Sequence, residues 1–214
     1  MKIQILISKN SWANDYKDYL KIKLRKFAKK IFFFNNHQKL NKNFDVNIIF
    51  SYFNIIPNSY LSYSKYNLIC HESDLPKGRG MSAITWQLLK NSDKITFSLI
   101  DAGNKIDSGN IYFQKKVKIK KTLLFDEIKF IQLKENTLFL IKFLKVFKLK
   151  KKFLSRKQIG KPTYFPRRSY KDNKININKS VKSQFNLLRL SDNNFYPNFF
   201  YYKNKKFFLK IYKK

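Results

Sequence analysis

The stretch HESDLPKGRG, residues 71–80, directly follows the short apolar run NLIC, residues 67–70. Its composition differs from that of the rest of the chain, in which Lys, Asn, Phe and Ile are common. Five of the 13 Asp and Glu residues lie within residues 72–107, and four of the 5 Gly lie within residues 78–109. Drift in base composition does not place scarce residue types so locally. We therefore expect this part of the chain to carry the functional site.

Apolar runs and amphipathic segments alternate on both sides of this stretch. Runs suited to buried strands occupy residues 3–7, 46–50, 67–70, 95–100 and 111–119. Segments with helical periodicity occupy residues 13–30, 82–90 and 123–148. Strands that alternate with helices predict an α/β fold, here a Rossmann-like, mostly parallel twisted sheet with helices on both faces.

The composition and the hydrophobic pattern of the sequence change near residue 150. Residues 148–174 are basic, contain several turn-forming residues and have no clear period, which is typical of an extended connection over the surface. A helix at 179–190 and a terminal strand at 207–212 complete the chain. We therefore expect a catalytic domain, residues 1–150, followed by a linker and small C-terminal extension, residues 151–214.

The composition excludes several classes of protein. With 214 residues and 43% hydrophobic residues, the chain is too apolar to be disordered and can bury a core. The single Cys rules out a disulfide framework and a cysteine-based zinc site, and we predict no metal site. The N-terminus has only a short apolar run, and no apolar run is long enough to span a membrane. We expect a cytoplasmic protein.

The net charge of +33 has two interpretations. Clustered Lys neutralises phosphates and favours nucleic-acid binding. However, Lys, Asn, Ile, Phe and Tyr are all encoded by A/T-rich codons, and Arg, which reads bases with its bidentate fork, is scarce. We favour codon bias. In either case an anionic substrate would be attracted at long range.

His71 and Asp107 are the candidate catalytic pair. Each follows an apolar strand, and ligands of open α/β sheets bind beyond the carboxyl ends of strands. We expect the two strands to be adjacent and to end at the same edge of the sheet, which would bring His71 and Asp107 within reach of one another. A carboxylate beside an imidazole fixes its tautomer and suits acid–base chemistry near neutral pH. The alternative is that both residues merely satisfy backbone groups in turns.

Residues 71–89 and 95–114 together resemble the core signature of the folate-dependent formyltransferases. This family includes methionyl-tRNA, glycinamide ribonucleotide and nucleotide-sugar formyltransferases, and its pattern is His-x-Ser-x-Leu-Pro, a Gly, and then Asp-x-Gly. The matching positions are His71, Ser73, Leu75, Pro76, Gly80, Asp107 and Gly109. Residues 51–57 resemble the folate-pocket segment of the family. The tail from residue 175 resembles the segment that follows the catalytic domain in larger members.

The resemblance implies transfer of a formyl group from 10-formyltetrahydrofolate to an amine. His71 would act as base or oxyanion partner, and Asp107 would orient it. Residues implied to bind the folate are Phe53, Asn54, Ile56, Asp101, Ala102, Gly103 and Asn104.

Other residues near the motif have a candidate role and a plainer alternative. Ser73 would contact substrate or cap a turn, and Lys77 and Arg79 would bind a phosphate or lie on the surface. Glu72 and Asp74 would hold the substrate ammonium or be solvated.

Two departures from the family pattern stand out. The family has an Asn two residues before the His, where this chain has Ile69. Such an Asn donates to the developing oxyanion, and losing one such donor typically costs roughly 10²–10³ in rate. Asn67 and Asn104 are candidate replacements. In addition, the loop before Asp107 is two residues longer than usual. A catalytically degenerate member is the alternative.

We expect the acceptor to be a small-molecule amine, most naturally a nucleotide-linked amino sugar. Transfer RNA is the less favoured acceptor, because the chain ends one strand into the region that corresponds to the C-terminal barrel of the tRNA enzyme. A nucleic-acid-binding module on a retired catalytic scaffold is the alternative from another class. A homodimer is compatible with the sequence.

Overall fold

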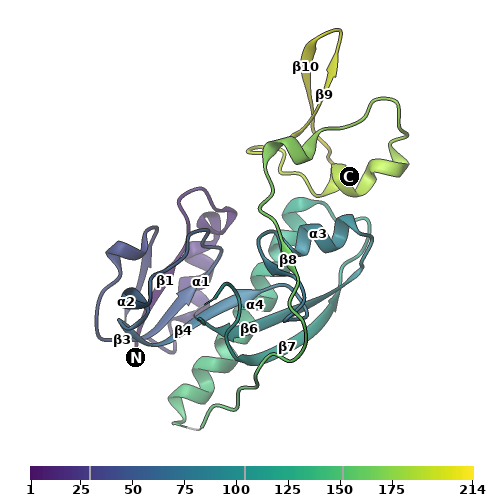
Figure 1. Cartoon of the computed structure of the whole chain (residues 1–214). Coiled ribbons are helices and arrows are strands. Elements are labelled where there is room, and N and C mark those ends of the chain that lie inside the picture. Colours follow the sequence, from purple (N-terminus) through teal and green to yellow (C-terminus); the bar gives the residue numbers. More distant parts are fainter. Residues whose placement is uncertain (29, 104, 151) are drawn as a thin grey trace.

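The computed structural model describes residues 1–28, 30–103, 105–150 and 152–214 (Figure 1). The strands are β1 (Lys2–Leu6), β2 (Lys30–Phe34), β3 (Phe44–Ile49), β4 (Ser64–His71), β5 (Arg79–Gly80), β6 (Lys94–Asp101), β7 (Ile111–Lys118), β8 (Tyr164–Phe165), β9 (Asn198–Tyr202) and β10 (Lys205–Leu209). The α-helices are α1 (Lys17–Leu24), α2 (Asn58–Leu61), α3 (Ala83–Leu89), α4 (Phe125–Lys148) and α5 (Phe185–Arg189). Short 3₁₀ turns occupy Trp12–Tyr16, His37–Lys39, Tyr170–Asn173 and Lys182–Gln184.

A six-stranded sheet in the order β2-β1-β3-β4-β6-β7 forms the centre of the fold. β2, β1, β3 and β4 are mutually parallel, whereas β6 is antiparallel to both β4 and β7. The predicted α/β class with a mostly parallel sheet is confirmed. The expectation that β4 and β6 end at the same edge is wrong, because hydrophobic periodicity carries no information on strand direction.

The strand β2 was missed, and the helix before it is shorter than predicted. The sequence KIFFF continues a lysine-rich amphipathic segment, and the periodicity therefore predicts one helix over residues 13–30. In the structure, α1 ends at Leu24, and β2 pairs with β1 as the edge strand of the sheet.

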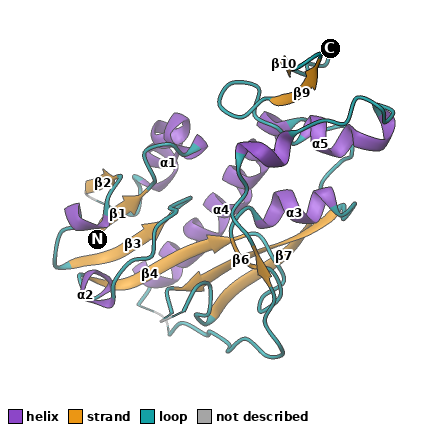
Figure 2. Cartoon of the chain, turned by 45° about the horizontal axis from the view of Figure 1, so that its top comes forward, coloured by secondary structure: helices purple, strands orange, loops and turns teal. Residues whose placement is uncertain are grey.

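The core lies between the sheet and the long helix α4, which runs along one face of the sheet (Figure 2). β1, β3 and β6 contribute Ile5, Ile48 and Phe97, and α4 contributes Leu140 and Phe143; each is fully buried or nearly so. α1 packs beside α4. No helix within the described ranges has the length and apolar character needed to cross a membrane.

After α4, residues 152–169 run back across the sheet before the small C-terminal extension begins (Figure 1). Arg156 forms a backbone bridge with Ile111, and β8 pairs with β5. The helix predicted at residues 179–190 is shorter in the structure, where α5 spans Phe185–Arg189. The predicted terminal strand is part of a hairpin, β9–β10, that reverses at Lys203 and Asn204, both with positive φ.

Candidate active site

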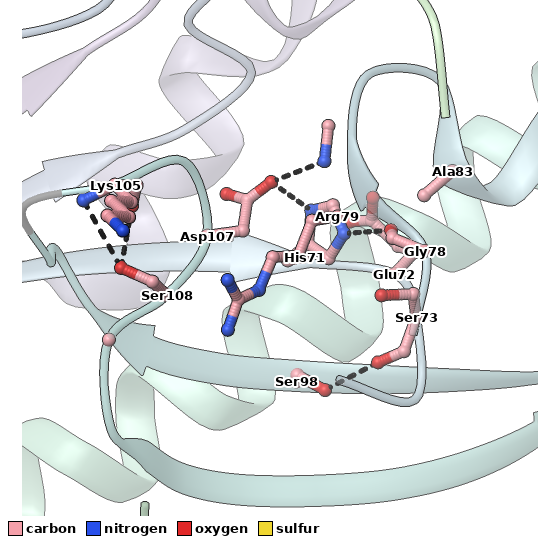
Figure 3. Close-up of polar contacts among 12 residues, drawn as sticks. His71, Glu72, Ser73, Gly78, Arg79, Ala83, Ser98, Lys105, Asp107 and Ser108 are labelled. Atoms are coloured by element: carbon pink, nitrogen blue, oxygen red, sulfur yellow. Dashed lines mark hydrogen bonds and ion pairs between the residues drawn. The ribbon is translucent and has the colours of Figure 1, made fainter. Parts of the chain in front are cut away.

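His71 is the last residue of β4 and is buried, with 6% of its surface exposed. Its Nε2 donates to the carbonyl oxygen of Gly78 at 2.8 Å, which places a proton on Nε2 (Figure 3). Its Nδ1 lies 3.5 Å from Oδ2 of Asp107. Nδ1 is therefore the ring nitrogen that is free to take up a proton, and a carboxylate faces it.

Asp107 reaches His71 because the loop between β6 and β7 folds back on itself. The end of β6 lies beside Leu68, away from His71, so the loop must return toward the C-terminal end of β4. Gly109 permits this, because a Cβ there would lie 1.7 Å from the carbonyl oxygen of Asp101. Asp107 has a φ of 47°, and its Oδ2 accepts from the backbone N–H of Gly80 at 2.8 Å.

The segment around β8 lies against the loop that follows His71. The backbone N–H of Gly78 donates to Oγ1 of Thr163 at 2.8 Å. Gly80 has a φ of 96°, and a Cβ there would lie 2.4 Å from the carbonyl oxygen of Phe165. The two glycines of the motif thus allow β5 and β8 to approach closely.

Gln158, in the same segment, joins the His71 loop to the Asp107 loop. Its Oε1 accepts from Nε and Nη2 of Arg79 at 3.2 and 2.7 Å. Its Nε2 donates to the carbonyl oxygens of Asp107 and Gly109 at 2.7 and 2.8 Å. The sequence held no signal for this role, since Gln158 is an isolated amide in a basic linker.

A cleft with a volume of about 310 Å³ opens beside His71 and Asp107. Tyr52 and Phe53 line one part of it, and the backbone N–H of Phe53 donates to Oγ of Ser8 at 2.8 Å. The cleft therefore offers aromatic surface next to the candidate acid–base pair.

A polar cluster from α4 lines another part of the cleft together with Glu72. Nδ2 of Asn136 donates to Oε1 of Glu72 at 2.8 Å, and Nζ of Lys129 donates to Oε1 of Gln132 at 2.9 Å. Lys129 also lies over the ring of Trp12, 5.0 Å from its centroid. Burial lowers the pKa of Lys129 to about 8, against the opposing effect of nearby carboxylates.

Sequence reasoning missed the α4 cluster, although a signal was present. Gln132 and Asn136 are four residues apart and therefore share a helix face. That face also carries Leu133 and Leu140, which are fully buried. Two amides on a buried stripe need hydrogen-bond partners, and this need marks such a pair as part of a polar site.

Arg167 and Arg168 bring further positive charge to the cleft from the C-terminal part of the chain. The guanidinium of Arg167 lies 5.9 Å from the ring centroid of Phe53. That of Arg168 lies 5.2 Å from the ring of Trp86 and donates to Oδ1 of Asn173 at 2.6 Å. Burial lowers the pKa of Arg168.

Only one of the described residues predicted to bind the folate, Phe53, lines this cleft. Asn54 is exposed and Ile56 is half-buried. Asp101, Ala102 and Gly103 lie at the far end of β6, where the backbone N–H of Ala102 donates to the carbonyl oxygen of Asn67 at 2.8 Å. Burial raises the pKa of Asp101. Asn104 lies outside the described residues.

Of the residues predicted to bind the acceptor, Glu72 lines the cleft, whereas Ser73, Asp74, Lys77 and Arg79 do not. Ser73 is 2% exposed, and its carbonyl oxygen accepts from Oγ of Ser98 at 2.8 Å. Lys77 is exposed to solvent. Arg79 is buried, and its guanidinium is held by Gln158.

The position of the family's Asn is apolar in structure as well as in sequence. Ile69 packs against Leu75, Ile100 and Ile111. Asn67 donates from Nδ2 to the carbonyl oxygen of Leu61 at 2.8 Å, and its Oδ1 accepts from Asn47 at 3.1 Å. The side chain of Asn67 is thus already engaged on both sides.

A model of the formyl transferase family matches residues 13–141. The methionyl-tRNA formyltransferase of Thermodesulfovibrio yellowstonii is 33% identical over 175 residues, which cover 79% of this chain and 52% of that relative. The chain thus spans about half the length of this curated relative.

Solved structures show the same fold. A methionyl-tRNA formyltransferase from Clostridium thermocellum matches with a TM-score of 0.75 and 21% identity, covering 96% of this chain and 90% of that one. A likely sugar N-formyltransferase from Mycobacterium tuberculosis matches with a TM-score of 0.75 and 11% identity, covering 98% and 96%. HypX from Aquifex aeolicus in complex with tetrahydrofolic acid matches with a TM-score of 0.75 and 14% identity, covering 99% and 37%.

His71 and Asp107 of the motif lie beside a cleft of an α/β sheet, an arrangement that fits a group-transfer enzyme. The family model covers more than half of the chain. The protein belongs to the formyl transferase family, which confirms the resemblance seen in the sequence.

Proposed function

We propose that the protein transfers a formyl group from 10-formyltetrahydrofolate to a primary amine. The observation that carries the proposal is the His71–Asp107 pair beside a cleft, in a chain of the formyl transferase family. In this proposal the folate supplies the formyl group, and the side chains of the protein bind the reactants and move protons.

His71 takes up a proton from the acceptor at Nδ1. The Nε2–H bond to Gly78 fixes the tautomer, and Asp107 stabilises the imidazolium that forms. The amine nitrogen bonds to the formyl carbon, and the bond from that carbon to the folate nitrogen breaks. Of the two protons that the ammonium loses, one ends on the folate nitrogen and one is released.

The residues beside His71 fit a folate. Tyr52 and Phe53 present aromatic side chains to the cleft, and a flat pterin or aminobenzoyl ring stacks favourably on such surfaces. The hydrogen bond from Phe53 N–H to Ser8 holds this wall in place. Asp101, Ala102 and Gly103 remain predicted pterin ligands through their backbone groups.

We propose a nucleotide-linked amino sugar as the acceptor. Lys129 and Arg167 give the cleft positive charge that suits a diphosphate, and the M. tuberculosis structure with the same fold is named a likely sugar N-formyltransferase. Transfer RNA is the second candidate, because the T. yellowstonii relative is a methionyl-tRNA formyltransferase. A cytoplasmic location and a homodimer stay predictions.

The test is formyl transfer by the full chain with 10-formyltetrahydrofolate and a panel of amines. The panel holds dTDP- and UDP-linked amino sugars and methionyl-tRNA, and formation of the formamide and release of tetrahydrofolate are both followed. We expect turnover with a nucleotide sugar. Turnover with methionyl-tRNA alone would replace the proposed acceptor, and no turnover with any amine would overturn the proposed function.

A further inference from the structure

Glu72 is a buried carboxylate in the cleft, one residue after His71. Only 8% of its surface is exposed. Asn136 of α4 donates to its Oε1 at 2.8 Å, and Gln87 of α3 donates to its backbone carbonyl oxygen at 2.6 Å. Two helices therefore hold both the carboxylate and the main chain of Glu72 in position.

No cation of the protein is paired with this carboxylate within the described ranges. The ion pairs found there join His71 to Asp107, Lys115 to Glu135 and Lys213 to Glu127. Lys129 lines the same cleft, but its ammonium group is directed to Gln132 and to the ring of Trp12. An ionised carboxylate removed from water is costly unless a cation or several donors compensate it. Glu72 has one neutral hydrogen-bond donor, and Lys129, although close enough to interact with it electrostatically, does not pair with it directly.

Asn136 provides a second, independent sign of a missing ligand. The residue is 2% exposed and lines the cleft. Its Nδ2 is bonded to Glu72, but its Oδ1 is buried and has no hydrogen-bond partner among the described residues. Such an unsatisfied acceptor in a native site calls for a donor.

We propose that Glu72, supported by Asn136, is the docking site for the ammonium group of the acceptor. The inference rests on the proposed formyl transfer and names the residue that selects a charged amine. A primary ammonium group brings a positive charge that can pair directly with Glu72, and its three N–H donors are enough for Glu72 and for a neighbouring acceptor such as Asn136 Oδ1.

The position of Glu72 in the cleft would attract a cationic amine and hold it in the cleft that also contains His71. The chain carries a net charge of +33, which repels a cationic amine, and a carboxylate in the cleft offsets this repulsion locally. His71 is the preceding residue and lines the same cleft, so an ammonium held by Glu72 shares the cleft with the group that takes its proton. Arg167, from the C-terminal part of the chain, also lines the cleft and would hold an anionic end of the same acceptor.

The experiment compares Glu72→Gln with the wild-type chain. The change removes the charge but keeps an oxygen for Asn136. Glu135→Gln on α4 is the matched control, because Glu135 pairs with Lys115 and does not line the cleft. For the amine that wild type formylates best in the panel, we expect KM to rise about 10- to 100-fold in Glu72→Gln, the loss of one charged hydrogen bond. KM for 10-formyltetrahydrofolate should change less than about twofold, which also shows that the site is folded.

A binding measurement separates docking from turnover. The probes are dTDP-4-amino-4,6-dideoxyglucose and the same nucleotide sugar with a hydroxyl in place of the amine. Wild type and Glu135→Gln should bind the amine more tightly, and Glu72→Gln should lose this preference. If wild type forms formamide but Glu72→Gln keeps the wild-type acceptor KM and amine preference, the inference fails and the proposed function stands. If wild type formylates no amine, the proposed function fails, and the inference falls with it.

Discussion

Nδ1 of His71 and Oδ2 of Asp107 lie 3.5 Å apart, although the strands that precede the two residues run in opposite directions. Parallel strand ends do not produce this proximity. It depends on the β6–β7 loop, which closes at Gly109 and is held by Gly80 and Gln158. The geometry of this pair therefore depends on loops that are held against the sheet by hydrogen bonds and close backbone contacts.

Removing either member of the pair should slow turnover strongly. In His71→Ala or Asp107→Asn, we expect kcat to fall by about 10²–10⁴-fold, the usual contribution of a positioned acid–base group. The steady-state rate and the circular dichroism spectrum are measured together. Asp18→Asn, an exposed change on α1, is the control and should keep full activity. Wild-type rates in the His71→Ala, Asp107→Asn double variant would refute the site assignment.

Gln158 should act on the reaction through Asp107. Gln158→Leu leaves the buried Arg79 without its acceptor and should cost about 1–3 kcal/mol of stability. Gln158→Glu keeps the acceptor for Arg79 but loses the donors to the carbonyls of Asp107 and Gly109. We therefore expect Gln158→Glu to retain stability and still lose up to roughly 10²-fold in kcat, because the Asp107 loop shifts.

The pH profile of kcat tests this positioning role. The profile should move in Gln158→Glu, because Asp107 no longer faces His71 in the same way, and it should stay unchanged in the exposed variant Gln38→Glu. A purely structural role for Gln158 would be indicated if activity followed stability in both Gln158 variants.

Gly80 should be far less tolerant of substitution than Gly160. Both have positive φ, 96° and 108°, so Ala is strained at either position. A Cβ at Gly80 would also lie 2.4 Å from the carbonyl oxygen of Phe165, whereas at Gly160 the nearest atom is Cγ of Pro76 at 3.9 Å. Urea denaturation should show Gly160→Ala to cost about 1–3 kcal/mol and Gly80→Ala to cost more. Equal losses of stability in the two variants would mean that β5 and β8 can move apart at little energetic cost.

Part of this site could be predicted from the sequence, and the rest depends on strand direction and long-range contacts that the sequence pattern does not show. The end of β4 at His71 was predictable, because the apolar run NLIC stops where polar residues begin. The return of Asp107 was expected, but from parallel strand ends, and periodicity could not show that β6 runs the other way. The role of Gln158 depends on long-range backbone contacts that leave no local pattern.

Lys129 should make stability depend on pH in the alkaline range. Burial lowers its pKa to about 8 in the folded protein, below its ordinary value of 10.5, while Glu72 and Asp192 act in the opposite direction. Between about pH 8 and pH 10.5 the unfolded chain binds more protons at this residue than the folded chain does. Lys129 therefore makes the free energy of unfolding rise with pH in this window, and this increase is lost again as the pH falls to about 8. Lys129→Met should therefore be more stable than wild type at pH 7, and the difference should shrink toward pH 10. Thermal unfolding across this range checks the sign, with Lys134→Met, an exposed change on the same helix, as the control. A stability difference between Lys129→Met and wild type that does not change with pH would show that Lys129 keeps its proton in the folded cleft.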